Sequence, residues 1–484
     1  MIWFTPLRSQ WISHGLLAAV LVATLPLAQG ADAARSTQRP PTRNAPLTAL
    51  DRYVHTPDNA YSWKVAGSVK GEGGTAFYID MTSQNWLTTN EVNRTAWRHW
   101  LIVARPDQLD STTALLFISG GANRDERPPK VSGDLARIAR ETKSVVVELK
   151  MVPNQPLIFG NDGAERVEDD LIAYTWDKFL RTGDEKWPAR LPMTKSAVRA
   201  MDTVTAFCAS EAGGGAKVDS FIVAGGSKRG WTTWTTAITD KRVVAICPIV
   251  IDVLNLEESM YHHYQAYGFW APAVGNYVQH GIMDWMKTPP MHALCKIEDP
   301  YSYRERLTLP KLMLNACGDQ FFLPDSSQFY FDDLPSPKYL RYVPNADHSL
   351  KGSDAYETLL AWHDINIHRR RVPDWTWKHG RSGEVKIRAE DKPTSVKLWK
   401  ATNPKARDFR LETLGPVWQS TDLAADAKGG YRAEVETPAE GWTAYMVELT
   451  FDVGAKTPLK MTTDVRVIPD KLPYPPPTPS AKAR

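Results

Sequence analysis

One stretch, from Val218 to Trp234, constrains the fold of this chain more than any other. It reads VDSFIVAGGSKRGWTTW: a short apolar run, two glycines, Ser227, and the start of a segment without proline or glycine over 231–240. A buried strand, a glycine-cramped turn carrying one serine, and a helix together form the layout of a nucleophile elbow. The glycines leave room for a strained turn that exposes the hydroxyl, and the helix directs its positive N-terminal dipole at the site.

The motif also has a plainer interpretation, and it departs from the usual pattern at one place. Gly-x-Ser is common, and Ser227 in an ordinary strand-to-helix turn would simply cap the helix. The second residue after the serine is Arg229, where the commonest form of the motif has glycine, and Gly230 follows one place later. Features elsewhere in the sequence are therefore needed to distinguish a catalytic Ser227 from a capping one.

Short apolar runs alternate with helical patterns on both sides of this stretch. The expected strands lie at 77–81, 100–104, 114–119, 145–149, 221–224, 243–250, 311–315 and 339–343. The expected helices lie at 134–142, 195–211 and 354–368. Apolar strands separated by helices indicate a doubly wound, mostly parallel sheet covered on both faces, which is an α/β fold.

Two segments interrupt this rhythm. Residues 153–192 contain prolines, glycines and an acidic cluster that begins at Glu165, and residues 255–306 are long and aromatic. We expect both to be insertions that cap a site or form its wall. The acidic cluster is typical of a solvated helix start, with substrate contact as the alternative. A metal role for His262 and His263 is disfavoured, because no carboxylate or third histidine follows at a ligand-like spacing.

The two ends of the chain differ from its middle. Residues 1–33 combine a basic start, a short apolar run and an Ala-x-Ala exit, which predicts a cleaved signal peptide rather than an uncleaved anchor. Residues 34–48 are a polar, proline-rich linker. The hydrolase-like part then spans 49–371. Short alternating runs over 372–472 predict an antiparallel β-sandwich of immunoglobulin-like type, and 473–484 form a proline-rich tail.

Composition limits the possible partners and the chemistry. The chain has 484 residues, which suits two domains, and its net charge of +3 gives no case for nucleic acid. No other segment has the length and apolarity of a membrane span, so the mature protein is expected outside the cytoplasm, secreted or periplasmic. We expect no cofactor and no metal. The four cysteines are either buried thiols or disulfides, with Cys247 and Cys317 as the first candidates for a bridge.

Order along the chain strengthens the catalytic interpretation of Ser227. Asp319 follows a later predicted strand in a Gly-Asp turn, and His348 follows the strand after that. The order Ser, Asp, His is that of α/β-hydrolases, and each residue falls at the carboxyl end of a predicted parallel strand. In this hypothesis His348 takes the proton of Ser227, and Asp319 orients the imidazole. Each residue also has a structural interpretation, and Asp325 is a competing acid.

A triad of this kind needs two backbone donors for the oxyanion and a pocket for the substrate. We expect one donor to be the amide of Lys228 and the other to be Gly121 or Ala122, in the glycine turn after an early strand. Trp231 and Glu165 are candidate substrate contacts. Arg229 is a third, binding either a substrate carboxylate or an acidic residue of the first insertion, and we favour pairing within the protein.

Five motifs in order resemble the PhoPQ-activated pathogenicity-related proteins: SGGAN, GGSKRGW, PIVIDVLN, GDQFFLPDSS and NADHSL. The resemblance extends from about residue 49 into the C-terminal β region. It implies an exported α/β-hydrolase-like protein with a triad at Ser227, Asp319 and His348. It also implies a link to bacterial virulence and to resistance against cationic antimicrobial peptides. The reaction of the family is poorly defined, so the resemblance implies no single substrate.

Three functions follow from these observations. The first is an exported serine hydrolase that cleaves a small-molecule ester or amide, or a peptide, since acidic insertion residues would attract a basic chain. The second is a carbohydrate esterase of glucuronoyl-esterase-like type, because those enzymes have a comparable serine turn and aromatic walls suit sugars. The third is a non-catalytic binding or sequestering protein on a hydrolase scaffold. Reactivity of Ser227 separates the third from the other two.

Overall fold

A computed structural model describes residues 47–126, 128, 130–380 and 383–478 of the chain. The expected signal peptide and all but the last two residues of the expected linker lie outside the described residues. Within the described part, no helix is both long enough and apolar enough to cross a membrane.

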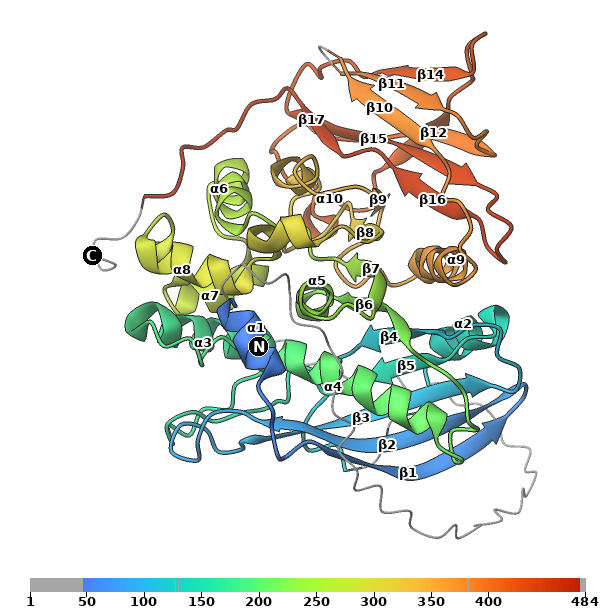
Figure 1. Ribbon diagram of the computed structural model, residues 1–484. Helices are drawn as coiled ribbons and strands as arrows, with labels where there is room; N and C mark the ends of the chain where they lie inside the picture. The colour runs from blue at the N-terminus through green and yellow to red at the C-terminus, as the bar shows by residue number, and fades with distance from the viewer. Residues whose placement is uncertain (1–46, 127, 129, 381–382, 479–484) are drawn as a thin grey trace, which may run out of the picture. The chain divides into compact units, whose positions relative to one another are not determined.

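A large mixed sheet forms the centre of the described chain, and nine of its strands run in the order β1-β2-β3-β5-β4-β6-β7-β8-β9 (Figure 1). Their bounds are β1 Ser62–Gly71, β2 Gly74–Asn85, β3 Ala96–Pro106, β4 Thr113–Ile118, β5 Val146–Leu149, β6 Ser220–Gly226, β7 Val243–Ile249, β8 Lys311–Ala316 and β9 Lys338–Val343. The neighbours from β5 to β9 pair in parallel, and β3 is antiparallel to both β2 and β5. The predicted α/β-hydrolase architecture, with a largely parallel sheet, is confirmed.

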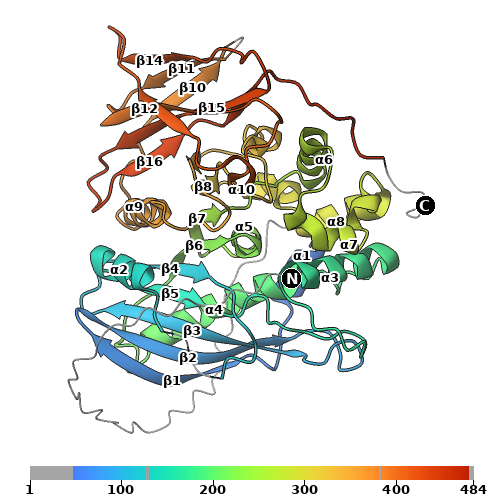
Figure 2. The same cartoon turned by 180° about the vertical axis from the view of Figure 1, so that it is seen from behind.

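Helices cover the two faces of this sheet, and the views from front and back agree on their placement (Figures 1 and 2). One face carries α1 Ala49–His55, α4 Arg190–Ala209 and α5 Lys228–Thr239, whose apolar side chains form one core. The other face carries α2 Gly133–Thr142 and α9 Ala355–Ile367, which form a second core with the opposite side chains of the strands. The predicted helices at 134–142, 195–211 and 354–368 therefore exist close to their expected bounds.

The two interruptions of the strand–helix rhythm are mostly helical. The first contains α3 Glu168–Thr182, and the second contains α6 Leu256–Tyr267, α7 Gly275–Gln279, α8 Pro289–Glu298 and the 3₁₀ segments η1 Pro272–Val274, η2 Ile282–Trp285 and η3 Pro300–Arg306. Helix α3 contacts α7, α8 and η2, so the two insertions pack against each other. Both insertions lie at the carboxyl ends of the parallel strands, where the predicted site residues are also found.

The C-terminal strands are antiparallel, as predicted, but only one of the two groups that they form is a sheet of its own. Strands β12 Ser395–Asn403, β13 Gln419–Asp422, β15 Trp442–Phe451, β16 Leu459–Thr462 and β17 Arg466–Ile468 extend the central sheet. The junction is the pairing of Thr462 in β16 with Leu340 in β9. Strands β10 Trp375–His379, β11 Glu384–Ala389 and β14 Gly430–Glu434 form a separate three-stranded sheet. The sandwich prediction is thus correct in part, and its immunoglobulin-like topology stays a prediction.

The expected bridge between Cys247 and Cys317 is wrong, because all four cysteines are free. Cys247 lies on β7 and packs into the core beneath α9, whereas Cys317 follows β8 and packs into the core on the other face of the sheet. Their side chains therefore point to opposite faces. The Cys317 thiol instead lies 4.0 Å from the sulfur of Met446.

Candidate active site

Ser227 occupies the sharp turn between β6 and α5. Its backbone angles are φ 57° and ψ −125°, a region that non-glycine residues rarely adopt. Such a conformation costs about 1–3 kcal/mol and persists where the surrounding structure imposes it. The serine is the only residue between the strand and the helix, so its side chain is held at the carboxyl edge of the sheet.

Two glycines make this turn possible. A Cβ atom at Gly225 would lie 2.8 Å from the carbonyl oxygen of Arg229, and one at Gly230 would lie 2.8 Å from the carbonyl oxygen of Gly225. Strand and helix therefore touch through these two positions. The departure from the usual motif is explained: close approach requires glycine at 230, and position 229 points elsewhere and accepts an arginine.

His348 and Asp319 are joined by a hydrogen bond at the same edge. Asp319 follows β8 and His348 follows β9, and the imidazole Nδ1 lies 2.8 Å from Asp319 Oδ2. The other carboxylate oxygen accepts the backbone amide of Phe321 at 2.7 Å. Because a carboxylate only accepts, Nδ1 carries the proton and Nε2 is left as the acceptor. Among the described residues, the Ser227 hydroxyl has no hydrogen-bond partner.

The competing acid, Asp325, is held elsewhere. Its Oδ2 lies 3.0 Å from His262 Nε2 and 2.5 Å from a guanidinium nitrogen of Arg407, and all three side chains are buried. Burial raises the pKa of Asp325, but the charges of Arg407 and His262 outweigh it and hold the pKa below its usual range. Asp325 therefore joins the acid turn to the C-terminal region and does not contact His348.

The predicted oxyanion donors lie on two elements. Lys228 is the first residue of α5, so its amide has no partner within the helix. Gly121 follows β4 with a φ of +138°, which only glycine adopts readily. The Ala122 amide, in contrast, donates to Asp125 Oδ2 at 3.2 Å, so of the two candidates in this turn Gly121 is the better placed.

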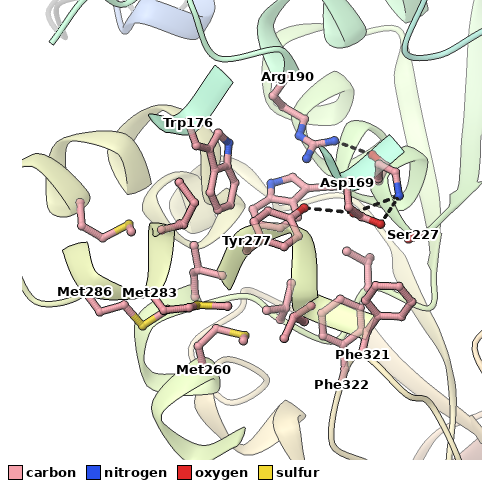
Figure 3. Close-up of a pocket in the computed structure, with 18 residues that line it drawn as sticks. Asp169, Trp176, Arg190, Ser227, Met260, Tyr277, Met283, Met286, Phe321 and Phe322 are labelled. Atoms are coloured by element: carbon pink, nitrogen blue, oxygen red, sulfur yellow. Dashed lines mark hydrogen bonds and ion pairs between the residues drawn. The ribbon is translucent and has the colours of Figure 1, made fainter. Parts of the chain in front are cut away.

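A narrow apolar pocket of about 50 Å³ opens beside Ser227 (Figure 3). Ser227 and Asp169 lie on one side of it, and Met260, Met283 and Met286 lie on the other. Its remaining walls come from α5, from helical segments of both insertions and from the turn after β8. They include Trp176, Trp231, Val274, Tyr277, Ile282, Met291, Phe321 and Phe322. The ring of Phe321 also packs on His348, with centroids 4.4 Å apart.

The charged groups around this pocket are paired with one another. Lys228 Nζ lies 3.0 Å from both Asp169 and Glu168. Arg190 lies 3.2 Å from Glu298, and both are fully buried. Burial would raise the pKa of Glu168, but hydrogen bonds from Arg229 and the charge of Lys228 prevail and lower it to about 2. The pocket therefore offers no uncompensated charge to a ligand.

Comparison with known proteins places the chain in a family. The profile described as "PhoPQ-activated pathogenicity-related protein" matches residues 50–410. A curated relative, Autocrine proliferation repressor protein A of Dictyostelium discoideum, is 35% identical over 456 residues, covering 88% of this chain and 92% of the relative. The chain belongs to the PhoPQ-activated pathogenicity-related protein family. The family resemblance read from five short motifs is thus confirmed.

Solved structures similar to this family member are hydrolases at low sequence identity. Acetyl xylan esterase 1 from a Thermoanaerobacterium species is 13% identical with a TM-score of 0.45, covering 66% of this chain and 91% of the esterase. An S-formylglutathione hydrolase from Agrobacterium tumefaciens is 15% identical with a TM-score of 0.39, covering 63% and 99%. At these scores the strand order and the family match, rather than the likenesses, establish the fold.

The three predicted substrate contacts of this PhoPQ-related protein lie in different places. Trp231 lines the pocket, and its indole nitrogen donates to the carbonyl oxygen of Glu298. Arg229 binds both oxygens of Glu168, at 2.6 and 2.8 Å, so it pairs within the protein, as favoured. Glu165 pairs with Arg124 and is not among the residues that line the pocket.

Several pocket residues were missed by reasoning from the sequence. They are the four methionines, the two phenylalanines after Asp319, and Arg190. The phenylalanines lie directly in the GDQFF motif, so their position beside a predicted acid was a usable signal. The methionines carry no local pattern, because they come from separate elements of one insertion. In the described part of the chain, no group of three or more His, Cys, Asp or Glu side chains could hold a metal ion.

Proposed function

We propose that this family member is a serine hydrolase that cleaves an ester or amide, with Ser227 as nucleophile, His348 as general base and Asp319 as its orienting acid. The observation that carries the proposal is a strained serine that lines an apolar pocket, together with a histidine at the same edge of the sheet whose Nδ1 is held by a buried carboxylate. A strained backbone and an oriented imidazole cost stability and suit a nucleophile and base.

The proposed roles follow acyl-transfer chemistry. His348 Nε2 accepts the Ser227 proton as the oxygen attacks the carbonyl carbon, and the amides of Lys228 and Gly121 stabilise the oxyanion. The imidazolium is stabilised by Asp319, which stays ionised. Collapse of the tetrahedral intermediate releases the alcohol or amine and leaves an acyl-enzyme, which water hydrolyses.

A basic peptide has little support as the substrate. The acidic residues expected to attract it, Glu168 and Asp169, are paired with Lys228 and Arg229, and Glu165 is paired with Arg124. An uncharged ester suits the apolar pocket better, because a charged group would lose its hydration there without gaining a partner.

A binding protein on a hydrolase scaffold is the second candidate function. It is favoured by the name of the Dictyostelium relative, which describes a repressor of proliferation rather than an enzyme. For this chain we also propose export, to the periplasm or the outside of the cell, from its N-terminal sequence. N-terminal sequencing of the protein recovered outside the cytoplasm tests export, and a mature start near residue 34 is the expected result.

Hydrolysis of 4-nitrophenyl acetate tests the enzyme proposal. The wild type is expected to show a burst of nitrophenol followed by turnover, and Ser227→Ala is expected to abolish both. Ser220→Ala is the matched control, since Ser220 begins the same strand at its far end and bonds to Thr113. Equal activity of Ser227→Ala and the wild type would contradict the proposal.

A further inference from the structure

A second, more polar pocket adjoins the proposed triad on the side of His348. It encloses about 520 Å³ and is bounded by the carboxyl ends of β6 and β7, the turn after His348, and the first turns of α2 and α9. Figures 1 and 2 show α2 and α9 side by side on one face of the sheet, and Arg137 of α2 lies 3.0 Å from Glu357 of α9. This pocket is larger than the apolar one.

We propose that the two pockets divide an ester substrate, the apolar pocket holding a short acyl group and the polar pocket holding a hydroxyl-rich alcohol. The inference rests on the proposed serine-hydrolase function and adds the class of substrate. The proposal is based on the residues that line the two pockets. Ser227 lines the apolar pocket, and His348 lines the polar one.

The chemistry of acyl transfer indicates which pocket binds the acyl group and which binds the alcohol. When the tetrahedral intermediate collapses, the bond between the carbonyl carbon and the leaving oxygen breaks, and His348 gives that oxygen the proton it took from Ser227. The alcohol therefore leaves on the side of His348. The acyl group stays bonded to the Ser227 oxygen until a water adds to the carbonyl carbon, gives its proton to His348 and displaces the serine. The acyl group therefore lies in the pocket of Ser227.

The acyl half must be small, apolar and uncharged. The apolar pocket is the narrower of the two, with about 50 Å³ of free volume against about 520 Å³, so it suits a short acyl chain better than a long one. Its walls are mainly methionines and aromatic rings, and its charged groups pair with each other. The methionines can change rotamer at low cost, so trimming one of them should extend the pocket rather than collapse it.

The alcohol half meets a different surface. Phe117 and Tyr356 stack with ring centroids 6.3 Å apart and both line the polar pocket, where rings can cover the C–H face of a sugar or other polyol. Asp134 and Lys351 line the same pocket, and among the residues that the structure describes neither forms an ion pair. Unlike the charges around Ser227, these two groups are available to hydroxyls.

Two substrate series separate the halves. In the first, 4-nitrophenyl esters of acetate, butyrate and octanoate vary only the acyl group. We expect kcat/KM to fall at least 10-fold from acetate to octanoate in the wild type. Met283→Ala is expected to raise the octanoate-to-acetate ratio about 10-fold, and Met283→Phe to lower it, since a few methylenes in an apolar pocket are worth roughly that much.

In the second series, ethyl acetate and glucose pentaacetate share the acyl group and differ in the alcohol. Tyr356→Ala and Lys351→Ala are expected to lower kcat/KM for the sugar ester about 10-fold and to leave that for ethyl acetate within about 2-fold. The rate of deacylation after a 4-nitrophenyl acetate burst should not change in these variants, because the alcohol has already left. Lys392→Ala, in an exposed loop, is the matched control.

The outcomes are distinguishable from failure of the enzyme proposal. The division of the substrate is overturned if the preference for acyl length shifts in Tyr356→Ala and in neither Met283 variant. It is also overturned if Lys351→Ala lowers kcat/KM equally for ethyl acetate and for glucose pentaacetate. Either result leaves the serine hydrolase standing, because fluorophosphonate still labels Ser227. A folded wild type that neither labels nor hydrolyses any ester overturns the proposed function, and the division of the substrate falls with it.

Discussion

Trp418 and Asn345 exchange two hydrogen bonds across the boundary between the C-terminal strands and the triad. The Asn345 side chain donates to the Trp418 carbonyl oxygen at 2.9 Å, and the Trp418 amide donates to Asn345 Oδ1 at 2.9 Å. Asn345 begins the turn that carries His348. The turn of Asp319 is held from the same region, since the Leu411 amide donates to the Gly318 carbonyl oxygen at 3.0 Å. The C-terminal region therefore positions the loops of both the acid and the base.

Removing the Asn345 side chain should disturb His348 more than it disturbs substrate binding. Asn345→Ala loses both bonds and places alanine at a φ of 54°. We expect kcat for 4-nitrophenyl acetate to fall about 10- to 100-fold, as a displaced catalytic group would cause, with KM within about 3-fold. Asn345→Asp keeps the acceptor for the Trp418 amide and should recover part of kcat. An unchanged kcat in Asn345→Ala would show that this contact does not position the histidine.

A chain ending at residue 371 should not fold into an active enzyme. It would lose β16, which pairs with β9, and it would lose Glu448, one of the two carboxylates that pair with the buried Arg341. Because Asp354 still pairs with Arg341, the loss of Glu448 costs less than the roughly 3–5 kcal/mol of a buried charge left with no partner, and the loss of apolar contacts adds to it. Near-ultraviolet circular dichroism and urea unfolding of the truncated chain check this. A cooperative transition with retained fluorophosphonate labelling would instead establish a separable C-terminal module.

Asp252 should make stability depend on pH. Its carboxylate accepts the hydroxyls of Tyr330 and Tyr342, each at 2.6 Å. Burial, opposed by these bonds and aided by the charges of Asp319 and Asp325, raises the pKa of Asp252 from 3.8 to about 7. The folded protein thus holds this proton more tightly than the unfolded chain does, so its contribution to stability is complete below about pH 4 and is lost as the pH rises through 7.

The loss of stability with rising pH can be measured by comparison with Asp252→Asn, in which a neutral side chain of the same shape replaces the carboxyl group. A shift of this size corresponds to a loss of roughly 4 kcal/mol between pH 4 and pH 8. In Asp252→Asn the amide can still accept from one tyrosine and donate to the other, and most of this fall in the free energy of unfolding should disappear. Urea unfolding of both proteins at each pH gives the difference, and parallel curves for the two proteins would refute the assignment.

Asp319 should be needed for the reaction and not for the fold. Asp319→Asn is expected to lower kcat roughly 10⁴-fold, because an amide in place of the carboxylate favours the wrong imidazole tautomer. Asp347→Asn is the matched control: Asp347 is adjacent to His348, but its carboxylate only caps the turn by accepting from Ser349 at 2.6 and 2.9 Å. The control should stay within a few-fold of the wild type. Equal losses in both variants would point to damage of the turn rather than to an orienting acid.

The parts of the fold that the sequence predicted are those encoded locally. The parallel strands are short apolar runs, and the turns after β6, β8 and β9 contain the glycine or polar residues that end them. Once the strands are parallel, their carboxyl ends share one edge, and Asp319 and His348 meet there without any further information. The strand–turn–helix signal at Ser227 likewise depends on neighbouring residues only.

The parts that could not be predicted depend on contacts between distant segments. Nothing near Thr462 shows that it pairs with Leu340 and so continues the central sheet. The acidic cluster looked solvated because its partners, Lys228 and Arg229, lie about sixty positions away, as the contact between Glu168 and Arg229 shows. Cys247 lies near the end of β7 and Cys317 directly follows β8, but a position at a strand end does not tell on which face of the sheet the side chain lies.

Fluorophosphonate labelling of the purified protein tests the central claim, a reactive Ser227, most directly. Intact-mass spectrometry should show one adduct per chain in the wild type, and peptide mapping should place it on Ser227. Ser227→Ala should carry no adduct, Asp319→Asn should label far more slowly, and Ser220→Ala should label as the wild type does. A folded wild type that takes up no probe, or an adduct that persists in Ser227→Ala, would contradict the account.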